Sequence, residues 1–240
     1  MKITEYEIKG KVPQNLKLAF ISDLHGFDNE LILDELRKQS PDVVLIPGDV
    51  IHDDRNYKMG IEFLSLCNEL YPTYMSLGNH ETKFTGDIVG LIRETGVTLL
   101  ENSYTEFCGI IIGGLTTGYK QGEKQGRFKK TPPPDTEWLM EFEREQGFKI
   151  LLCHHPEYYP KYLKDAKVDL ILSGHAHGGQ WRFFGRGVFA PGQGLFPKYT
   201  SGFHDGKLIV GRGLGNPHSI PRINNKPEFI IINLKKEETV

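Results

Sequence analysis

Two histidines stand two residues apart in a glycine-rich stretch, Gly174-His175-Ala176-His177-Gly178, shortly after an apolar run. Side chains two residues apart diverge on a helix. On a strand or in a tight turn they can instead reach one small ligand together. Imidazole is the commonest metal ligand in proteins. The pattern therefore points to a metal site, provided that other parts of the chain bring further ligands to the same place.

Four more groups of ligand-type residues occur earlier in the chain, and each follows a short apolar run that is typical of a buried strand. They are Asp23-Leu24-His25, Gly48-Asp49, Gly78-Asn79-His80-Glu81 and His154-His155-Pro156. In open α/β sheets, sites form beyond the carboxyl ends of the strands. Five strand ends that carry Asp, Asn or His are hard to explain by packing, and they predict one shared site.

The apolar runs and spacings predict which elements position these groups. Strands are expected at residues 3–8 (an edge strand), 17–21, 42–46, 73–77, 97–100, 109–113, 148–152 and 168–172, and helices at 28–39, 57–70, 87–94 and 135–145. Alternating strands and helices imply a parallel sheet with helices on its faces. Two strands without intervening helices, at 207–211 and 228–233, predict a second, more antiparallel sheet.

We therefore expect an α/β fold, a four-layer α-β-β-α sandwich in which two mixed sheets pack face to face with helices outside. Because the ligand groups run from Asp23 to His177 without a linker, residues 1–240 are expected to form a single domain.

The overall composition excludes several classes of function. The 240 residues carry a formal net charge of −2, which argues against a general binder of nucleic acid or of membrane surfaces. No run approaches the roughly 20 apolar residues of a spanning helix, and the N-terminus lacks a signal-peptide core. Cys67, Cys108 and Cys153 have no metal or redox spacing, and buried free thiols fit a reducing compartment. A soluble, cytoplasmic protein is expected.

The candidate ligands offer oxygen and imidazole donors and no thiolate. They are Asp23, His25, Asp49, Asn79, His154, His175 and His177. Such a set suits Mn²⁺, Fe or Zn²⁺ and is unlike a Ca²⁺ or Mg²⁺ cage. Seven candidates are too many for one tetrahedral ion, but they suit two ions that share a bridging carboxylate. Two-metal sites of this kind drive in-line displacement at phosphorus.

These groups resemble the calcineurin-like metallophosphoesterase family, whose pattern is D-x-H, G-D, G-N-H-[DE], H-x-P and G-H-x-H. All five blocks occur here in order, from Asp23 to His177. The stretches Gly174–Arg182, Phe189–Gly192 and Gly211–Gly215 look like the bacterial branch that contains membrane-associated phosphodiesterases related to lipid-headgroup hydrolases. Relatives in that branch often carry an N-terminal membrane anchor, which we do not expect in this chain.

The resemblance implies a role for each matched residue. One metal ion would be held by Asp23, His25 and His177, a second by Asn79, His154 and His175, and Asp49 would bridge the two. The expected metal is Mn²⁺, with Fe or Zn²⁺ as alternatives, and a hydroxide that bridges the ions would be the nucleophile. His80 would contact the phosphate and assist the leaving oxygen. Asn79 and His155 are also expected to line the substrate site, although His155 could face water instead.

One position departs from the family pattern. The family usually has Asp or Asn three residues after the bridging Asp, whereas this chain has His52, followed by Asp53 and Asp54. The role of the missing residue could pass to Asp53. His204 and His218 match no ligand block, and we expect them at the surface or behind the ligands, with substrate contact as an alternative for His218.

Together, these residues predict a dinuclear-metal phosphodiesterase that acts on a small-molecule or lipid-linked phosphate ester, with peripheral membrane contact as an open option. The alternatives are a phosphomonoesterase or protein phosphatase, and a scaffold with the same fold that has lost catalysis. The scaffold is disfavoured because Asn79 and His80 are both present.

Two further segments have alternative interpretations. The basic loop at 116–134 could be a solvated connector, which we favour, or a flap over an anionic substrate. The aromatic residues Trp181, Phe183, Phe184, Phe189 and Phe196 could form an apolar rim for an acyl chain. The favoured interpretation places them in the core, where most such clusters lie.

Overall fold

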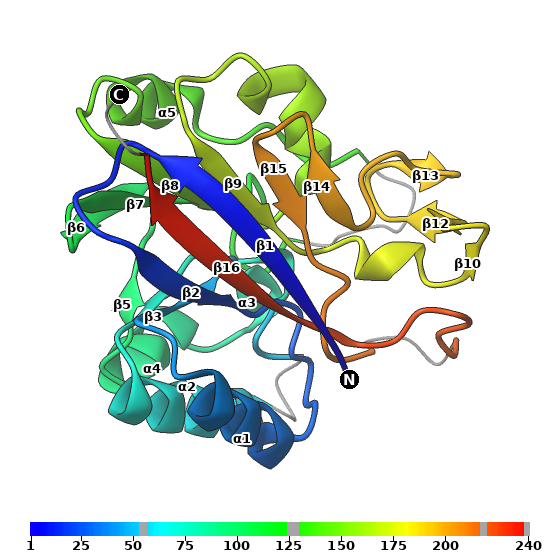
Figure 1. The fold of residues 1–240 in the computed structure, drawn as a ribbon. Helices are drawn as coiled ribbons and strands as arrows, with labels where there is room; N and C mark the ends of the chain where they lie inside the picture. The colour runs from blue at the N-terminus through cyan, green and yellow to red at the C-terminus, as the bar shows by residue number, and fades with distance from the viewer. Residues whose placement is uncertain (53–56, 124–129, 217–219, 238–240) are drawn as a thin grey trace.

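The computed structural model describes residues 1–52, 57–123, 130–216 and 220–237. Two six-stranded sheets pack face to face, with helices on the outer faces (Figure 1). The first sheet has the strand order β1-β16-β2-β3-β4-β5, and the second has the order β14-β15-β9-β8-β7-β6. Both sheets contain parallel and antiparallel pairs. The predicted four-layer sandwich is therefore confirmed.

The first sheet and its helices come from the N-terminal part of the chain and from its last strand. The strands are β1 (Lys2–Gly10), β2 (Leu16–Phe20), β3 (Val43–Ile46), β4 (Thr73–Met75), β5 (Thr98–Leu99) and β16 (Glu228–Lys236). The helices are α1 (Asn29–Gln39), α2 (Tyr57–Leu70), α3 (Asn79–Lys83) and α4 (Ile88–Glu94). The Asp28 carboxylate accepts the Leu31 N–H and so caps the start of α1, as expected for this residue type.

The second sheet comes from the middle of the chain. Its strands are β6 (Ser103–Phe107), β7 (Ile110–Leu115), β8 (Phe148–Cys153), β9 (Leu170–Ser173), β14 (Gly202–His204) and β15 (Leu208–Val210). Helical segments here are α5 (Thr136–Phe142), η1 (Pro156–Tyr158), η2 (Tyr159–Leu163) and η3 (His177–Gly179). Two small hairpins project beside it, β10 (Arg182–Phe183) with β11 (Arg186–Gly187) and β12 (Phe189–Ala190) with β13 (Gly194–Leu195).

Buried side chains fill the three spaces between the four layers. Ile231 belongs to the cluster between the first sheet and the helices α1, α2 and α4, whereas Ile232 belongs to the cluster between the sheets. Successive residues of a strand point to opposite faces, so β16 is buried on both sides. A third cluster joins the second sheet to α5 and η2, through Phe142, Leu151 and Tyr159.

The prediction that residues 228–233 belong to the second sheet is wrong. β16 lies in the first sheet, parallel to β1 and antiparallel to β2 (Figure 1). A strand that is apolar on both faces fits the interior of either sheet, so its composition does not choose between them. The second sheet instead gains β6, which the sequence analysis missed, and its central pairs β7–β8, β8–β9 and β9–β15 are all parallel.

Two local expectations also fail. The helix predicted to end near residue 145 ends at Phe142. The favoured placement of the aromatic residues near Phe184 in the core is wrong, because Trp181, Phe183, Phe184 and Phe196 are exposed. The predicted edge strand near the N-terminus is confirmed as β1. Among the described residues, no helix has both the length and the apolar character needed to cross a membrane.

Candidate metal centre

The candidate ligands gather where five strands end, because β2, β3 and β4 run parallel in one sheet and β8 and β9 run parallel in the other. Ligand-type atoms of Asp23, His25 and His177 lie within 4.8 Å of one another. The same holds for Asp49, His154 and His175. These six residues are buried, although they come from loops far apart in the sequence. The predicted convergence on one place is present.

The Asp49 carboxylate lies between the two groups. Its Oδ2 atom is 3.5 Å from His25 Nε2 and 3.1 Å from His154 Nε2. The Asp23 carboxylate occupies a similar position, since its Oδ1 is 3.5 Å from His177 Nε2 and 3.9 Å from His154 Nε2. The two triads are therefore parts of one centre.

Asn79 is placed beside this centre by the short helix α3, which the sequence analysis did not predict. Asn79 is its first residue and is buried. The next residue, His80, donates its backbone N–H to Asp49 Oδ1 at 2.8 Å. The His80 ring lies 4.4 Å from the His25 ring, between ring centroids. The segment that contains Asn79 is thus fixed directly against Asp49.

The backbone at the centre adopts an uncommon conformation. Five of the seven candidate ligands have a positive φ: Asp23 (51°), His25 (42°), Asp49 (57°), His175 (64°) and His177 (46°). Residues other than glycine rarely adopt this left-handed region, and the strain persists only where the surroundings impose it. Strain of this kind clusters at functional sites. Here the left-handed conformation directs the side chains of tight loops toward one point.

Two glycines allow the loops to approach one another. A Cβ atom on Gly78 would lie 2.3 Å from Asp49 Oδ1, and one on Gly174 would lie 2.4 Å from Asp23 Oδ2. Any larger residue at either position would collide with a candidate ligand. The glycines in the G-N-H and G-H-x-H blocks are therefore required by close packing against the carboxylates.

A buried carboxylate, Glu81, clamps the loops that carry Asp49 and Asn79. Its Oε1 accepts the N–H groups of Val50 and Ile51 at 2.8 and 3.2 Å, and its Oε2 accepts those of Asp49 and Gly78 at 2.9 and 2.8 Å. Burial and the neighbouring Asp49 raise the pKa of Glu81 to about 7, whereas the N–H donors favour its ionised form. The sequence analysis gave Glu81 no role beyond its place in the motif.

Burial also sets the charge of the candidate ligands. It lowers the pKa of His25, His175 and His177 well below the usual histidine value, so these rings are neutral and able to ligate. Burial raises the pKa of Asp23 to about 6. His154 differs, because the Asp49 and Asp23 carboxylates outweigh burial and raise its pKa to about 9. Without a metal ion, a proton on His154 offsets part of the buried negative charge.

The donor set fits metal ions. Both ring nitrogens of His25 and the Nδ1 atom of His154 make no hydrogen bond among the described residues, although both side chains are fully buried. A buried polar atom without a partner is costly, and a bound cation would supply the missing interaction. The oxygen and imidazole donors, without thiolates, match the preferences of Mn²⁺, Fe and Zn²⁺.

The comparison with known proteins agrees with this geometry. Residues 16–179, which include all five blocks, match the model of the family described as calcineurin-like phosphoesterase. The chain belongs to the calcineurin-like phosphoesterase family. The sequence-based assignment to this family is therefore confirmed.

Relatives of this chain occur in several bacteria. It is 31% identical to a protein of Campylobacter jejuni named uncharacterized metallophosphoesterase, over 98% of this chain and 63% of that protein. It is 29% identical to phosphodiesterase YaeI of Escherichia coli, over 91% of this chain and 82% of YaeI. The chain thus spans less than two thirds of the Campylobacter relative.

A solved structure supports the fold of this chain. Phosphopantetheinyl hydrolase from Mycobacterium tuberculosis superposes with a TM-score of 0.53 at 16% identity, over 86% of this chain and 92% of that one. At this identity the likeness concerns the fold alone.

His155 lies behind the candidate metal centre. It is fully buried, so the alternative that it faces water is wrong. Its Nε2 is 2.8 Å from Thr117 Oγ1, and its Nδ1 is 3.2 Å from Glu157 Oε1. The same Glu157 oxygen is 3.7 Å from His175 Nε2 and accepts a hydrogen bond from Thr131. Burial opposes ionisation of Glu157, but hydrogen bonds from His155 and Thr131 outweigh it and lower the pKa of this carboxyl.

The C-terminal part of the chain supports His177, and sequence reasoning missed this as well. Arg222 Nη2 lies 3.3 Å from His177 Nδ1, and Asn225 donates its side-chain N–H to the His177 carbonyl at 2.7 Å. Glu157, Arg222 and Asn225 fall outside every family block. Only the three-dimensional structure could connect them with the ligands.

The other histidines have separate positions. His52 lies beside the centre, where its carbonyl is 2.6 Å from His80 Nδ1 and its ring stacks on the His80 ring at 5.5 Å. His204 is half-buried in β14, away from the ligands, and its Nε2 is 3.1 Å from the Ser201 carbonyl. The expectations for His218, Asp53 and Asp54 lie outside the described residues, as does the central part of the basic loop, residues 124–129.

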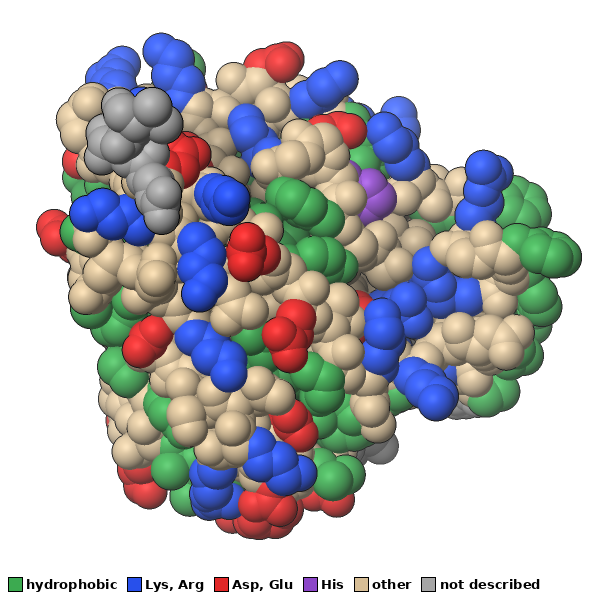
Figure 2. All heavy atoms as spheres, viewed as in Figure 1, with side chains coloured by type: hydrophobic (Ala, Val, Ile, Leu, Met, Phe, Trp, Pro, Cys, Tyr) green, Lys and Arg blue, Asp and Glu red, His purple; other side chains and the backbone are tan. Residues whose placement is uncertain are grey.

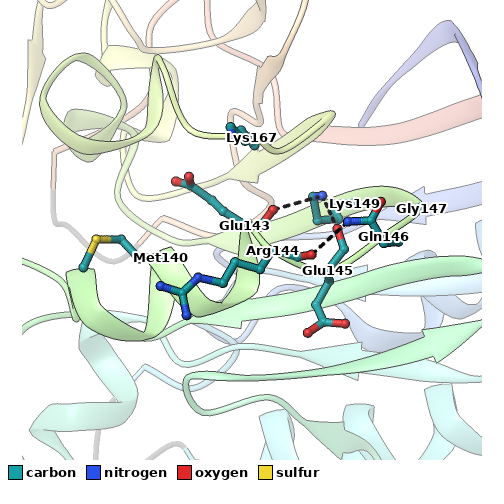
Figure 3. A pocket seen from close by; sticks show the side chains of 8 residues that line it. All are labelled: Met140, Glu143, Arg144, Glu145, Gln146, Gly147, Lys149 and Lys167. Carbon is teal, nitrogen blue, oxygen red and sulfur yellow. Dashed lines mark hydrogen bonds between the residues drawn. The ribbon is translucent and has the colours of Figure 1, made fainter.

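A hollow of about 690 Å³ lies far from this centre (Figure 3). It is lined by α5, the turn after it and Lys149, near the start of β8, whereas His154 directly follows the end of the same strand. Lys149 Nζ already donates to the carbonyls of Glu143 and Glu145, as the dashed lines in Figure 3 show. This hollow is therefore separate from the site.

The Glu81 clamp predicts a stability effect for an isosteric substitution. In Glu81→Gln, one carboxylate oxygen becomes an NH₂ group that faces two backbone N–H donors. We expect the free energy of unfolding to fall by about 2–4 kcal/mol, since buried donors would lose their acceptor. Urea unfolding would measure it, with exposed Glu106→Gln as the matched control, expected within about 0.5 kcal/mol of wild type. Equal stability of the two variants would contradict the clamp.

Proposed function

We propose that this protein is a dinuclear-metal-dependent phosphodiesterase. The observation that carries the proposal is the position of the Asp49 carboxylate, within 3.5 Å of His25 Nε2 and 3.1 Å of His154 Nε2. A single carboxylate between two ligand groups suits a bridge between two ions. Two-metal sites serve displacement reactions at phosphorus.

The proposed ligand assignments follow the two triads. Asp23, His25 and His177 would hold one ion, Asn79, His154 and His175 would hold the other, and Asp49 would serve both. When bound, two such ions would activate water as the nucleophile near neutral pH and offset negative charge on the phosphoryl oxygens. We propose Mn²⁺ as the native metal, with Fe or Zn²⁺ as alternatives. The buried carboxylates and neutral imidazoles support this assignment.

His80 is proposed to act on the leaving group. Its ring lies against His25, and its Nδ1 is held 2.6 Å from the His52 carbonyl, so the proton sits on Nδ1 and Nε2 is left for the substrate. Burial lowers the pKa of His80 to about 4, so the metal-free ring is neutral. With its proton on Nδ1, the neutral ring offers only a lone pair at Nε2, so it would bind a phosphate oxygen or serve as an acid only after gaining a proton there.

A diester is the preferred substrate class. Support comes from the similarity to phosphodiesterase YaeI, which matches 91% of this chain at 29% identity. A phosphomonoester or phosphoprotein remains the second candidate, because both ester classes present the same phosphoryl oxygens to a metal pair. Contact of His155 with the substrate stays a prediction, against which its complete burial argues. We also propose a single domain and a cytoplasmic location, the latter supported only by the free cysteines.

Metal dependence and the role of His80 give a direct test of activity. The metal-free protein should not hydrolyse bis(p-nitrophenyl) phosphate, and added Mn²⁺ should restore turnover. His80→Ala should retain two equivalents of metal but lower kcat by about 10²–10⁴-fold, the usual contribution of a positioned acid or base. Release of p-nitrophenol measures the rate, and elemental analysis measures the metal.

His204→Ala, which changes a histidine outside the centre, serves as the control and should keep wild-type turnover. Full activity in metal-stripped protein would refute the proposed function. Bound metal without turnover of either a diester or a monoester would favour the non-catalytic scaffold.

Glu157 gives a second prediction, which does not depend on knowing the substrate. Its carboxylate faces the Nε2 atom of His175 and should hold that ring in the orientation needed for ligation. Glu157→Gln should therefore weaken Mn²⁺ binding to the metal-free protein by about 10–100-fold. Calorimetric titration would measure the dissociation constants, with exposed Glu137→Gln as the control. An affinity within twofold of wild type would rule out this supporting role.

A further inference from the structure

An apolar surface lies beside the metal centre on what we call the hairpin lobe, formed by the β10–β11 and β12–β13 hairpins and residues 220–226. The Trp181–Ile223 bridge joins these parts. Phe184, Phe196 and Leu195 are 105%, 75% and 70% exposed, more than any other large hydrophobic residue described, the next being Met140 at 55%. An exposed apolar patch of this kind marks a binding surface for a protein or a membrane.

The conformation of the two phenylalanines strengthens this inference. Phe184 and Phe196 have φ values of 50° and 49°, in the left-handed region where a bulky residue is strained and glycine is not. Both side chains are exposed, so packing within the protein does not compensate for the strain. Their presence at the turns is explained if the rings interact with something outside the chain.

The segment that contains these rings is rich in basic residues. Between Gln180 and Pro227 the sequence has one acidic residue, Asp205, and seven basic ones: Arg182, Arg186, Lys198, Lys207, Arg212, Arg222 and Lys226. The net charge of −2 for the whole chain does not reveal this local excess of positive charge. The sequence-based argument against a membrane-surface binder therefore missed it. Figure 2 shows blue side chains gathered over the lobe, with hydrophobic ones at its outer edge.

A hollow of about 430 Å³ is lined by both basic and aromatic side chains. Arg182, Arg212, Phe183 and Phe184 contribute to its lining. The guanidinium of Arg182 is engaged with the carbonyls of Gly178 and Gly185. Arg212 Nε makes no hydrogen bond among the described residues, and its ion pair with Glu228 Oε2 is long, at 3.8 Å. Arg212 therefore has donors for a phosphate, next to aromatic rings that suit hydrocarbon.

We propose that the hairpin lobe docks on an anionic phospholipid bilayer, with Phe184 and Phe196 inserted between the lipids and the surrounding basic residues on the lipid phosphates. Interfacial binding strengthens with buried apolar area and with attraction to anionic lipids, and the lobe offers both. A protein interface is a weaker match, since charged residues are depleted at the centre of such interfaces.

Docking would place the metal centre close to the bilayer. β11 and β12 lie against η3, which begins at His177, and Arg222 on the lobe contacts the His177 ring. A phosphoester at the membrane surface would then be near the candidate ligands. The docking itself rests on the lobe alone and does not depend on the proposed catalytic function.

The test is co-sedimentation of the full chain with vesicles. We expect binding to vesicles of phosphatidylglycerol and phosphatidylcholine, weaker binding as salt is raised, and at least tenfold weaker binding to phosphatidylcholine alone. The double variant Phe184→Gly, Phe196→Gly should bind the anionic vesicles at least tenfold more weakly. Because glycine adopts a positive φ without strain, this variant should keep its fold.

One control variant and one charge variant make the result specific. Leu31→Ser with Met140→Ser removes exposed apolar side chains elsewhere and should bind like wild type. Arg186→Gln with Lys198→Gln should weaken binding and reduce its salt dependence. Hydrolysis of a soluble diester by the glycine variant should equal that of wild type, so a failed activity assay and a failed docking assay remain distinguishable.

Three outcomes would overturn the proposal. They are no binding of wild type to anionic vesicles, unchanged binding by the glycine variant, and a solution dimer that dissociates when both phenylalanines are replaced. The last outcome would make a second copy of the chain the occupant of the lobe.

Discussion

The structure depends on bringing the Asp49 carboxylate between His25 and His154 in a buried site. A carboxylate so far from water needs compensating positive charge and hydrogen-bond donors. The backbone N–H of His80 and the imidazoles supply part of this, and metal ions would supply the rest. The remaining architecture can be understood as a means of holding five separate loops around this group.

The folding free energy must offset the unfavourable backbone conformations of these loops. Several ligands adopt left-handed backbone conformations, and glycines at Gly78 and Gly174 permit contacts that any side chain would prevent. Such strain persists because each loop begins at the end of a buried strand and leads into a helical segment, which together fix its path. Glu81 adds a local constraint by gathering four backbone N–H groups. The stability of the two-sheet scaffold holds the site in this geometry before any ligand binds.

The sequence was sufficient to predict the family, the layered fold and which residues converge, because ligand types at strand ends are encoded locally and in order. It was insufficient where the determining contact is distant. β16 could have joined either sheet, and the support of His177 by Arg222 joins segments 45 residues apart. Phe184 is a large apolar residue of the kind usually found in a core. Its position on a turn leaves it exposed instead. The ligand roles themselves stay predictions until a metal is seen.

The most direct test is a crystal structure of the Mn²⁺-loaded protein, with anomalous scattering used to locate the ions. The account predicts two anomalous peaks about 3.5–4 Å apart, one on each side of the Asp49 carboxylate. One peak would touch Asp23, His25 and His177, and the other Asn79, His154 and His175. A single peak, or two peaks that do not share Asp49, would contradict it.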